Sequence, residues 1–212
     1  MLKNTITGIL ILSCSGCVLL EKKDPIAPVI DPEDAITPEV LFAPEATPIS
    51  AAECAGDMEL PVEFSRKFTA ISDPALLAES IDEAGKGKLC QGQVYVAKQN
   101  TQIMLFRAWN SSNSASEFGD WWALKSPRGQ VAQYRSDYQI CYQWSPLDKM
   151  TLCSLKAGAK VVIGTGQSTT CSSYLEYPSS AKKQVYVANA EANLFDCNSY
   201  NAEFNWTPII KN

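Results

Sequence analysis

The cysteines constrain the fold of this chain more than any other feature of its sequence. Cys14 and Cys17 lie close together near the N-terminus, and the other six are spread over the rest of the 212 residues. An even number of well-separated cysteines predicts three disulfides in an exported domain, with 15 possible pairings. The alternative is a zinc site, but this needs closely spaced ligands; the closest pair is 12 residues apart, and the chain has no histidine. We therefore expect disulfides and no metal site among Cys54, Cys90, Cys141, Cys153, Cys171 and Cys197.

Residues 1–16 have the layout of a signal peptide. Lys3 gives a positively charged start, residues 6–12 are mainly apolar, and Ser15 and Gly16 are small. The apolar stretch is about half as long as the roughly 20 residues that a membrane-spanning helix needs. These features predict export rather than retention as a transmembrane helix.

The segment Ser15-Gly16-Cys17 resembles the lipobox of bacterial lipoproteins, although Cys14 stands where that family usually has leucine. The resemblance implies that Cys17 carries a diacylglycerol and a fatty acid such as palmitate, and becomes the new N-terminus. Val18, the residue after the lipidated cysteine, favours the outer membrane of a Gram-negative cell. The alternative is plain secretion without a lipid anchor.

Residues 17–53 read as a linker. This segment holds half of the twelve prolines of the chain, interleaved with acidic residues. Proline blocks helix formation and like charges repel, so we expect an extended spacer between the membrane and the domain.

Residues 54–212 are long enough for one globular domain. They contain 15 basic and 15 acidic residues, so the net charge of −5 belongs to the leader and linker. A neutral domain lacks the basic surface that nucleic acid binding requires. We therefore expect no nucleic acid partner.

Several short segments of this domain have the composition of strands. They are rich in β-branched or aromatic residues, or alternate between apolar and polar residues, and are found at 93–97, 103–109, 160–163 and 184–188. Two helices are expected. One starts at Pro74 after a capping Asp73 and ends near Gly85, and the other carries Val131 through Cys141 at helical spacing. The prediction is an α+β domain of mostly antiparallel strands with two or three helices.

The absence of histidine removes several kinds of chemistry. No Ser-His-Asp triad, Cys-His dyad or imidazole base can form within this chain. Any catalysis must use carboxylates, Arg, Lys, Tyr, Ser or an amide.

One series of segments carries candidate chemistry. Phe106-Arg107-Ala108-Trp109 is followed by a polar loop and by Gly119-Asp120-Trp121-Trp122. Residues 155–164 then read as Leu-x-Ala-Gly-x-x-Val-x-x-Gly, and Gln184-Val185-Tyr186-Val187 closes the series. This order resembles ADP-ribosyltransferase-type and NAD-cleaving bacterial toxin domains, over residues 94–188.

The resemblance implies a role for each of these residues. Arg107 would grip the pyrophosphate of NAD, here a substrate rather than a cofactor, and Gln184 would stabilise an oxocarbenium-like transition state; we take both as catalytic. The aromatic rings of Trp121, Trp122 and Tyr134 could stack on the nicotinamide. Transferases of this type place a glutamate at the position of Gln184 or two residues beyond, where this chain has Tyr186, so NAD hydrolysis or an inert site is also open.

The competing hypothesis is a surface module without catalysis. The chain has five Trp and eight Tyr, and aromatic rings in a tethered domain could bind a glycan or a partner protein. The two hypotheses differ in whether Arg107, Trp121 and Gln184 meet in one cleft or lie scattered over the surface.

Overall fold

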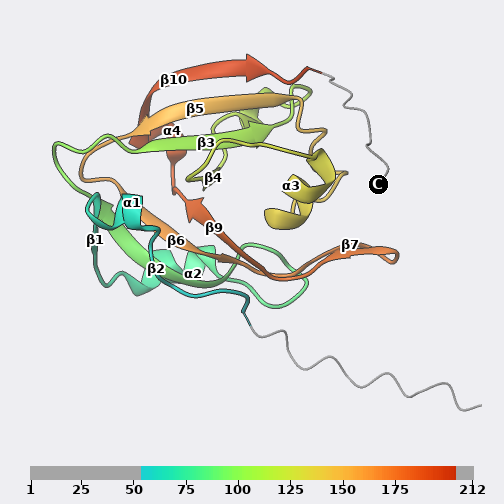
Figure 1. Cartoon of the computed structure of the whole chain (residues 1–212), viewed down its shortest axis with the longest axis horizontal. Helices are drawn as coiled ribbons and strands as arrows, with labels where there is room; N and C mark the ends of the chain where they lie inside the picture. The colour runs from blue at the N-terminus through green and yellow to red at the C-terminus, as the bar shows by residue number, and fades with distance from the viewer. Residues whose placement is uncertain (1–53, 204–212) are drawn as a thin grey trace, which may run out of the picture. The chain divides into compact units, whose positions relative to one another are not determined.

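The computed structural model describes residues 54–203 (Figure 1). The predicted signal peptide, the proline-rich linker and the lipidation site Cys17 lie outside the described residues. Within them the chain forms an α+β domain dominated by antiparallel sheet, which confirms the predicted fold class.

Ten strands and four α-helices occur within residues 54–203. The strands are β1 (Phe68–Ala70), β2 (Leu89–Ala97), β3 (Met104–Trp109), β4 (Trp121–Ala123), β5 (Lys149–Leu155), β6 (Lys160–Gly166), β7 (Thr169–Ser172), β8 (Leu175–Tyr177), β9 (Ser180–Tyr186) and β10 (Leu194–Asn201). The helices are α1 (Val62–Ser65), α2 (Pro74–Ser80), α3 (Val131–Asp137) and α4 (Ala190–Asn193), with a 3-10 turn, η1, at Ser114–Ser116. The two expected helices are α2 and α3, and the other two are single turns of four residues.

Eight strands form one sheet in the order β1-β2-β6-β9-β4-β3-β5-β10, and β7 pairs with β8 in a separate ribbon. The large sheet bends so that β3, β5 and β10 lie opposite β1, β2 and β6, with β4 and β9 between them (Figure 1). One cluster of buried side chains fills the bend and joins both arms, with Leu105 of β3 and Val161 of β6 both fully buried in it. Burial of this apolar surface is the main force that holds the bent sheet together.

Helix α2 covers the outer face of β2 and β6. Its Leu76 and Leu77 pack against Leu89, Val94 and Val162. Asp73 caps it as predicted, since its Oδ1 accepts a hydrogen bond from the amide of Leu76 at 3.2 Å. The helix ends at Ser80 rather than near Gly85, because Ile81 turns extended and bridges Leu89.

Helix α3 lies beside β9 and begins at Val131 as the spacing predicts, but it ends at Asp137, before Cys141. The chain leaves the helix at Tyr138, and Gln139 adopts a left-handed conformation with φ of 50°. Such a φ is uncommon for a residue with a side chain and ends the regular helix.

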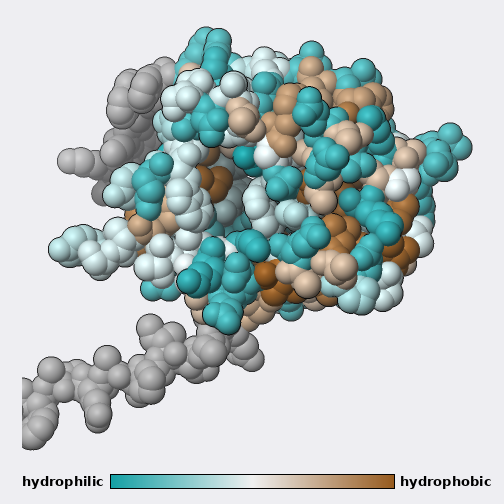
Figure 2. All heavy atoms as spheres, turned by 180° about the vertical axis from the view of Figure 1, so that it is seen from behind, coloured by the Kyte–Doolittle hydropathy of each residue, from teal (hydrophilic) through white to brown (hydrophobic). Residues whose placement is uncertain are grey.

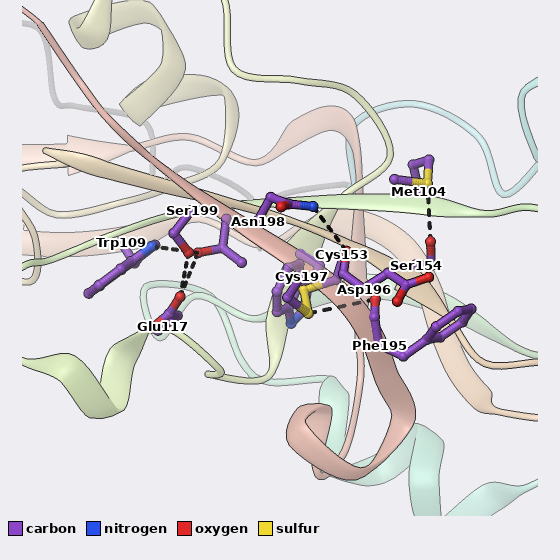
Figure 3. Close-up of a disulfide and its surroundings, with 12 residues drawn as sticks. Met104, Trp109, Glu117, Cys153, Ser154, Phe195, Asp196, Cys197, Asn198 and Ser199 are labelled. Carbon is purple, nitrogen blue, oxygen red and sulfur yellow. Dashed lines mark hydrogen bonds between the residues drawn. A yellow bond between two sulfur atoms is a disulfide. The ribbon is translucent and has the colours of Figure 1, made fainter.

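All six predicted cysteines form disulfides, which pair Cys54 with Cys90, Cys141 with Cys171, and Cys153 with Cys197. The first ties the start of the domain to β2, and the second ties the turn after α3 to β7. The third joins the neighbouring strands β5 and β10 (Figure 3). Among the described residues, no helix is long and apolar enough to cross a membrane.

Candidate functional site

A cavity of about 210 Å³ opens where β3, β4 and β9 face helix α3 and the turn that follows it. Its lining includes all five residues that the sequence singles out for NAD chemistry: Arg107, Gln184, Trp121, Trp122 and Tyr134. These residues come from segments up to 77 positions apart. Strand pairing brings them together, since Phe106 of β3 pairs with Ala123 of β4, and Ala123 pairs with Gln184 of β9.

Arg107 is half-buried and binds backbone carbonyls. Its Nε donates to the carbonyl oxygen of Ser116 and its Nη1 to that of Trp121, both at 2.6 Å. Burial lowers the pKa of the guanidinium, while the Asp120 carboxylate and the Tyr134 hydroxyl raise it. Among residues 54–203, no carboxylate forms an ion pair with Arg107.

Three of the five guanidinium N–H groups of Arg107 are not used by these two bonds. Nη2 lies against Gly119, where a side chain would collide with it. The glycine thus allows the polar loop to close over the guanidinium. The result is a positive charge at the cavity wall that anchors the loop.

Gln184 is 7% exposed and is fixed by a second glutamine. Its Nε2 donates to Oε1 of Gln139 at 2.7 Å. The Nε2 of Gln139 in turn donates to the backbone carbonyl oxygens of Ser136 at 2.9 Å and Pro178 at 3.3 Å. A side chain on Gly166 would overlap both carboxamides, so a glycine is needed beside this pair.

The two tryptophans of β4 point to opposite faces of the sheet. Trp122 is 2% exposed, belongs to the core cluster and donates from its Nε1 to the carbonyl oxygen of Gly119 at 2.7 Å. Trp121 is only half-buried and packs against the ring of Tyr186, with ring centroids 5.1 Å apart. Of this pair, Trp121 is therefore the ring that could stack on a ligand.

Tyr134 lies on α3 and packs against Tyr138, with ring centroids 4.6 Å apart. Burial raises the pKa of the Tyr134 hydroxyl far above its usual range, and the Arg107 charge offsets only part of that rise. Tyr134 is therefore a neutral phenol at neutral pH. It offers a ring face or an O–H donor, but no negative charge.

Gln139, Tyr138 and Trp144 are among the lining residues that the sequence interpretation does not assign to the site. Trp144 is 53% exposed and stands in the next turn along the chain after the one that carries Gln139. Only the aromatic-rich stretch from 134 to 144 hints at them, and an isolated glutamine in a turn gives no sequence signal. Contact with β9 gives Gln139 its place in the site.

The polar loop before β4 is docked on the sheet by a second network, next to the Cys153–Cys197 disulfide (Figure 3). Glu117 accepts hydrogen bonds from the hydroxyls of Ser199 and Thr151. Thr151 also accepts from the indole Nε1 of Trp109 at 2.9 Å. This network and the two carbonyl bonds of Arg107 together fix residues 116–121, which include Ser116 and Trp121 of the cavity wall.

Aromatic side chains are also exposed outside the cavity. Tyr142 is 60% and Tyr174 97% exposed, and both lie close in sequence to the Cys141–Cys171 disulfide. On the face seen in Figure 2, hydrophobic residues occur in several separate groups between hydrophilic ones. A comparison with family models, curated proteins and solved structures gives no match to this chain.

Proposed function

We propose that this domain binds NAD through its nicotinamide end and hydrolyses the bond between nicotinamide and ribose. The observation that carries the proposal is the meeting of Arg107, Trp121, Tyr134 and Gln184 at one cavity. The competing hypothesis of a flat aromatic binding face does not require this convergence.

The size of the cavity favours one ring system. Pockets that enclose drug-sized ligands measure roughly 300–1,000 Å³, and this one measures about 210 Å³. A nicotinamide ring would enter, and the rest of the dinucleotide would extend over the rim. Trp121 and Tyr134 supply ring faces for the pyridinium cation, a contact that contributes about 0.5–2 kcal/mol.

Charge distribution supports the same orientation. Arg107 is a cation with three N–H groups outside its two carbonyl bonds, and it belongs to none of the ion pairs within residues 54–203, although the charge of Asp120 favours its protonated form. A phosphate oxygen of the pyrophosphate would supply the missing anion, and hydrogen bonds between charged partners are about twice as strong as neutral ones.

The bond cleavage requires stabilisation of positive charge on the ribose. As the C1′–N bond breaks, its electron pair moves to the pyridinium nitrogen, neutral nicotinamide leaves, and the ribose becomes an oxocarbenium-like cation. The carboxamide oxygen of Gln184 would place the negative end of its dipole toward that cation. Water then attacks C1′ and releases a proton, which gives ADP-ribose.

Hydrolysis fits this chain better than transfer to a protein. Two residues beyond Gln184, where the transferases that it resembles can carry glutamate, stands Tyr186. Its ring packs on Trp121 and its hydroxyl donates to Glu79 at 3.4 Å. The position offers no carboxylate to activate an acceptor side chain, so water is the expected acceptor.

The test is nicotinamide release from NAD by the full chain, purified with its disulfides formed. Gln184→Met should lower kcat by about 100-fold, in the range found for loss of one transition-state contact. Arg107→Lys keeps the charge but cannot make both carbonyl bonds, and should raise KM about tenfold. Gln143→Met is the matched control, because Gln143 also donates to a backbone carbonyl but is exposed and outside the cavity. If the wild-type chain releases no nicotinamide, the proposal is wrong.

We further propose that the chain is exported and anchored to the outer membrane through a lipid on Cys17. Three disulfides in the described domain support export, since they persist in oxidising compartments. Mass spectrometry of the membrane fraction should find a lipid-modified N-terminal cysteine. A soluble chain with a free N-terminus would indicate plain secretion.

The second candidate function is recognition of a glycan or partner protein by the exposed aromatic residues. Tyr142, Trp144 and Tyr174 favour it, because large exposed aromatic rings are typical of binding surfaces. Glycan or protein binding that survives Gln184→Met and fails in Tyr174→Ala, a change outside the cavity, would support this function over NAD hydrolysis.

A further inference from the structure

We propose that Gln139 is a positioning residue for the reaction: it fixes the carboxamide of Gln184 so that the oxygen, and not the NH₂ group, faces the ribose. The inference rests on the proposed hydrolysis of NAD. It assigns to Gln139 a task that neither its sequence position nor any motif indicates.

Two backbone carbonyl groups fix the orientation of the Gln139 carboxamide. A carbonyl oxygen only accepts hydrogen bonds, and a carboxamide has one donor end and one acceptor end. The carbonyl oxygens of Ser136 and Pro178 lie 2.9 and 3.3 Å from Nε2 of Gln139. These acceptors therefore fix the NH₂ of Gln139 toward them, and its oxygen must point the other way.

The oxygen of Gln139 in turn orients the carboxamide of Gln184. The Oε1 of Gln139 needs a donor, and the NH₂ group of Gln184 supplies it at 2.7 Å. With its donor end engaged, Gln184 keeps its oxygen for the cavity, where that oxygen has no hydrogen-bond partner among the described residues. A buried carboxamide with the opposite orientation would oppose two acceptor oxygens and leave a donor unpaired, which is costly.

The backbone around Gln139 is held so that this relay keeps its geometry. Arg135 donates to the carbonyl oxygens of Ile140 and Cys141 at 3.3 Å and to that of Ser145 at 2.5 Å. The Cys141–Cys171 disulfide, two residues after Gln139, ties the same turn to β7. The Arg135 hydrogen bonds and the disulfide both stabilise this turn. The turn belongs to no helix or strand, and Gln139 has a left-handed backbone conformation in it.

A positioning role and a merely structural role predict different kinetics. Misplacement of a catalytic group by about 1 Å can lower the rate about 100-fold. Loss of Gln139 frees the carboxamide of Gln184 to rotate, but leaves Trp121, Tyr134 and Arg107 in place to bind NAD. The positioning role therefore lowers kcat and spares KM, whereas a general loosening of the domain changes both.

The test compares Gln139→Met with the control Gln143→Met in the full chain. Methionine keeps the length of the side chain and tolerates irregular surroundings. We expect kcat for NAD to fall about 10- to 100-fold with KM within about twofold, and no change in the control. A second readout, NMR of the Gln184 side-chain amide, should show one N–H protected from exchange in the wild type and not in Gln139→Met.

Each outcome decides a different part of the account. An unchanged kcat in Gln139→Met, with kcat of Gln184→Met lowered about 100-fold, overturns the role of Gln139 and leaves hydrolysis standing. An unprotected Gln184 amide in the wild-type chain overturns the orientation relay independently of any activity. A wild-type chain inactive on NAD overturns the hydrolysis, and with it the role of Gln139 in it.

Discussion

Gly166→Ala places a single methyl group against the two glutamines of the site. The new Cβ would overlap Oε1 of Gln139 and lie 2.5 Å from Nε2 of Gln184. Because both carboxamides are buried, they cannot swing into solvent, and the 2.7 Å bond between them must break. The cost has two parts. A buried amide that loses its partner costs about 1–3 kcal/mol, and an added methyl in a packed site costs about 1–3 kcal/mol more.

We therefore expect the free energy of unfolding to fall by about 2–6 kcal/mol in Gly166→Ala, measured by urea denaturation. For the folded fraction of Gly166→Ala, kcat for NAD should fall by about 100-fold. Gly158→Ala is the control, since its added Cβ meets nothing but its φ of +82° makes alanine unfavourable. It should cost about 1–2 kcal/mol of stability without any loss of kcat. Wild-type kcat and stability in Gly166→Ala would refute the reasoning about the glutamine pair.

Three further predictions address the aromatic ring, the disulfide and the phenol. Trp121→Leu should raise KM for NAD about tenfold, because the stacking ring is lost; an unchanged KM would remove Trp121 from the site. Replacing both Cys141 and Cys171 by serine should lower the free energy of unfolding by about 4 kcal/mol, because the disulfide closes a loop with a sequence separation of 30. It should also lower kcat, because the turn that carries Gln139 loosens. An unchanged kcat would show that the disulfide serves stability alone. Burial raises the pKa of Tyr134 above its ordinary 10.0, so the folded state holds this proton more tightly and stability should fall as pH rises above about 10. A Tyr134→Phe variant should show a shallower fall, by denaturation at pH 8 and 11, and identical slopes would contradict this.

The sequence predicts four of the ten strands within residues 54–203 and both of the longer helices, but not the remaining strands. The strand segments lie in β2, β3, β6 and β9, because alternation and β-branched residues report directly on half-buried strands. The sequence pattern places the ends of both helices several residues beyond their true ends at Ser80 and Asp137. Ile81 and Gln139 leave the helical conformation for tertiary reasons, one to bridge β2 and the other to meet Gln184.

The candidate site could be assembled from the sequence only in part. Arg107, Trp121 and Gln184 belong to segments that resemble a known pattern, Tyr134 lies between two of these segments, and the structure lines one cavity with all four. The core position of Trp122 and the role of Gln139 could not be predicted. Both depend on which face of β4 and β9 is covered, and the order of strands in the sheet decides that.

The disulfide pairing was open for the same reason. Six cysteines allow 15 pairings, and sequence spacing does not choose among them. The pairing of Cys153 with Cys197 follows from the adjacency of β5 and β10, which lie side by side despite 44 residues of separation.

The most direct test of the central claim is proton NMR of NAD mixed with the oxidised full chain and followed over time. The account predicts that the nicotinamide signals of NAD give way to those of free nicotinamide, with ADP-ribose formed in equal amount and no ADP-ribose attached to the protein. The same mixture with the Gln184→Met variant should stay unchanged over the same period. Intact NAD in the wild-type sample, with no change in its line widths, would contradict both cleavage and binding at this cavity.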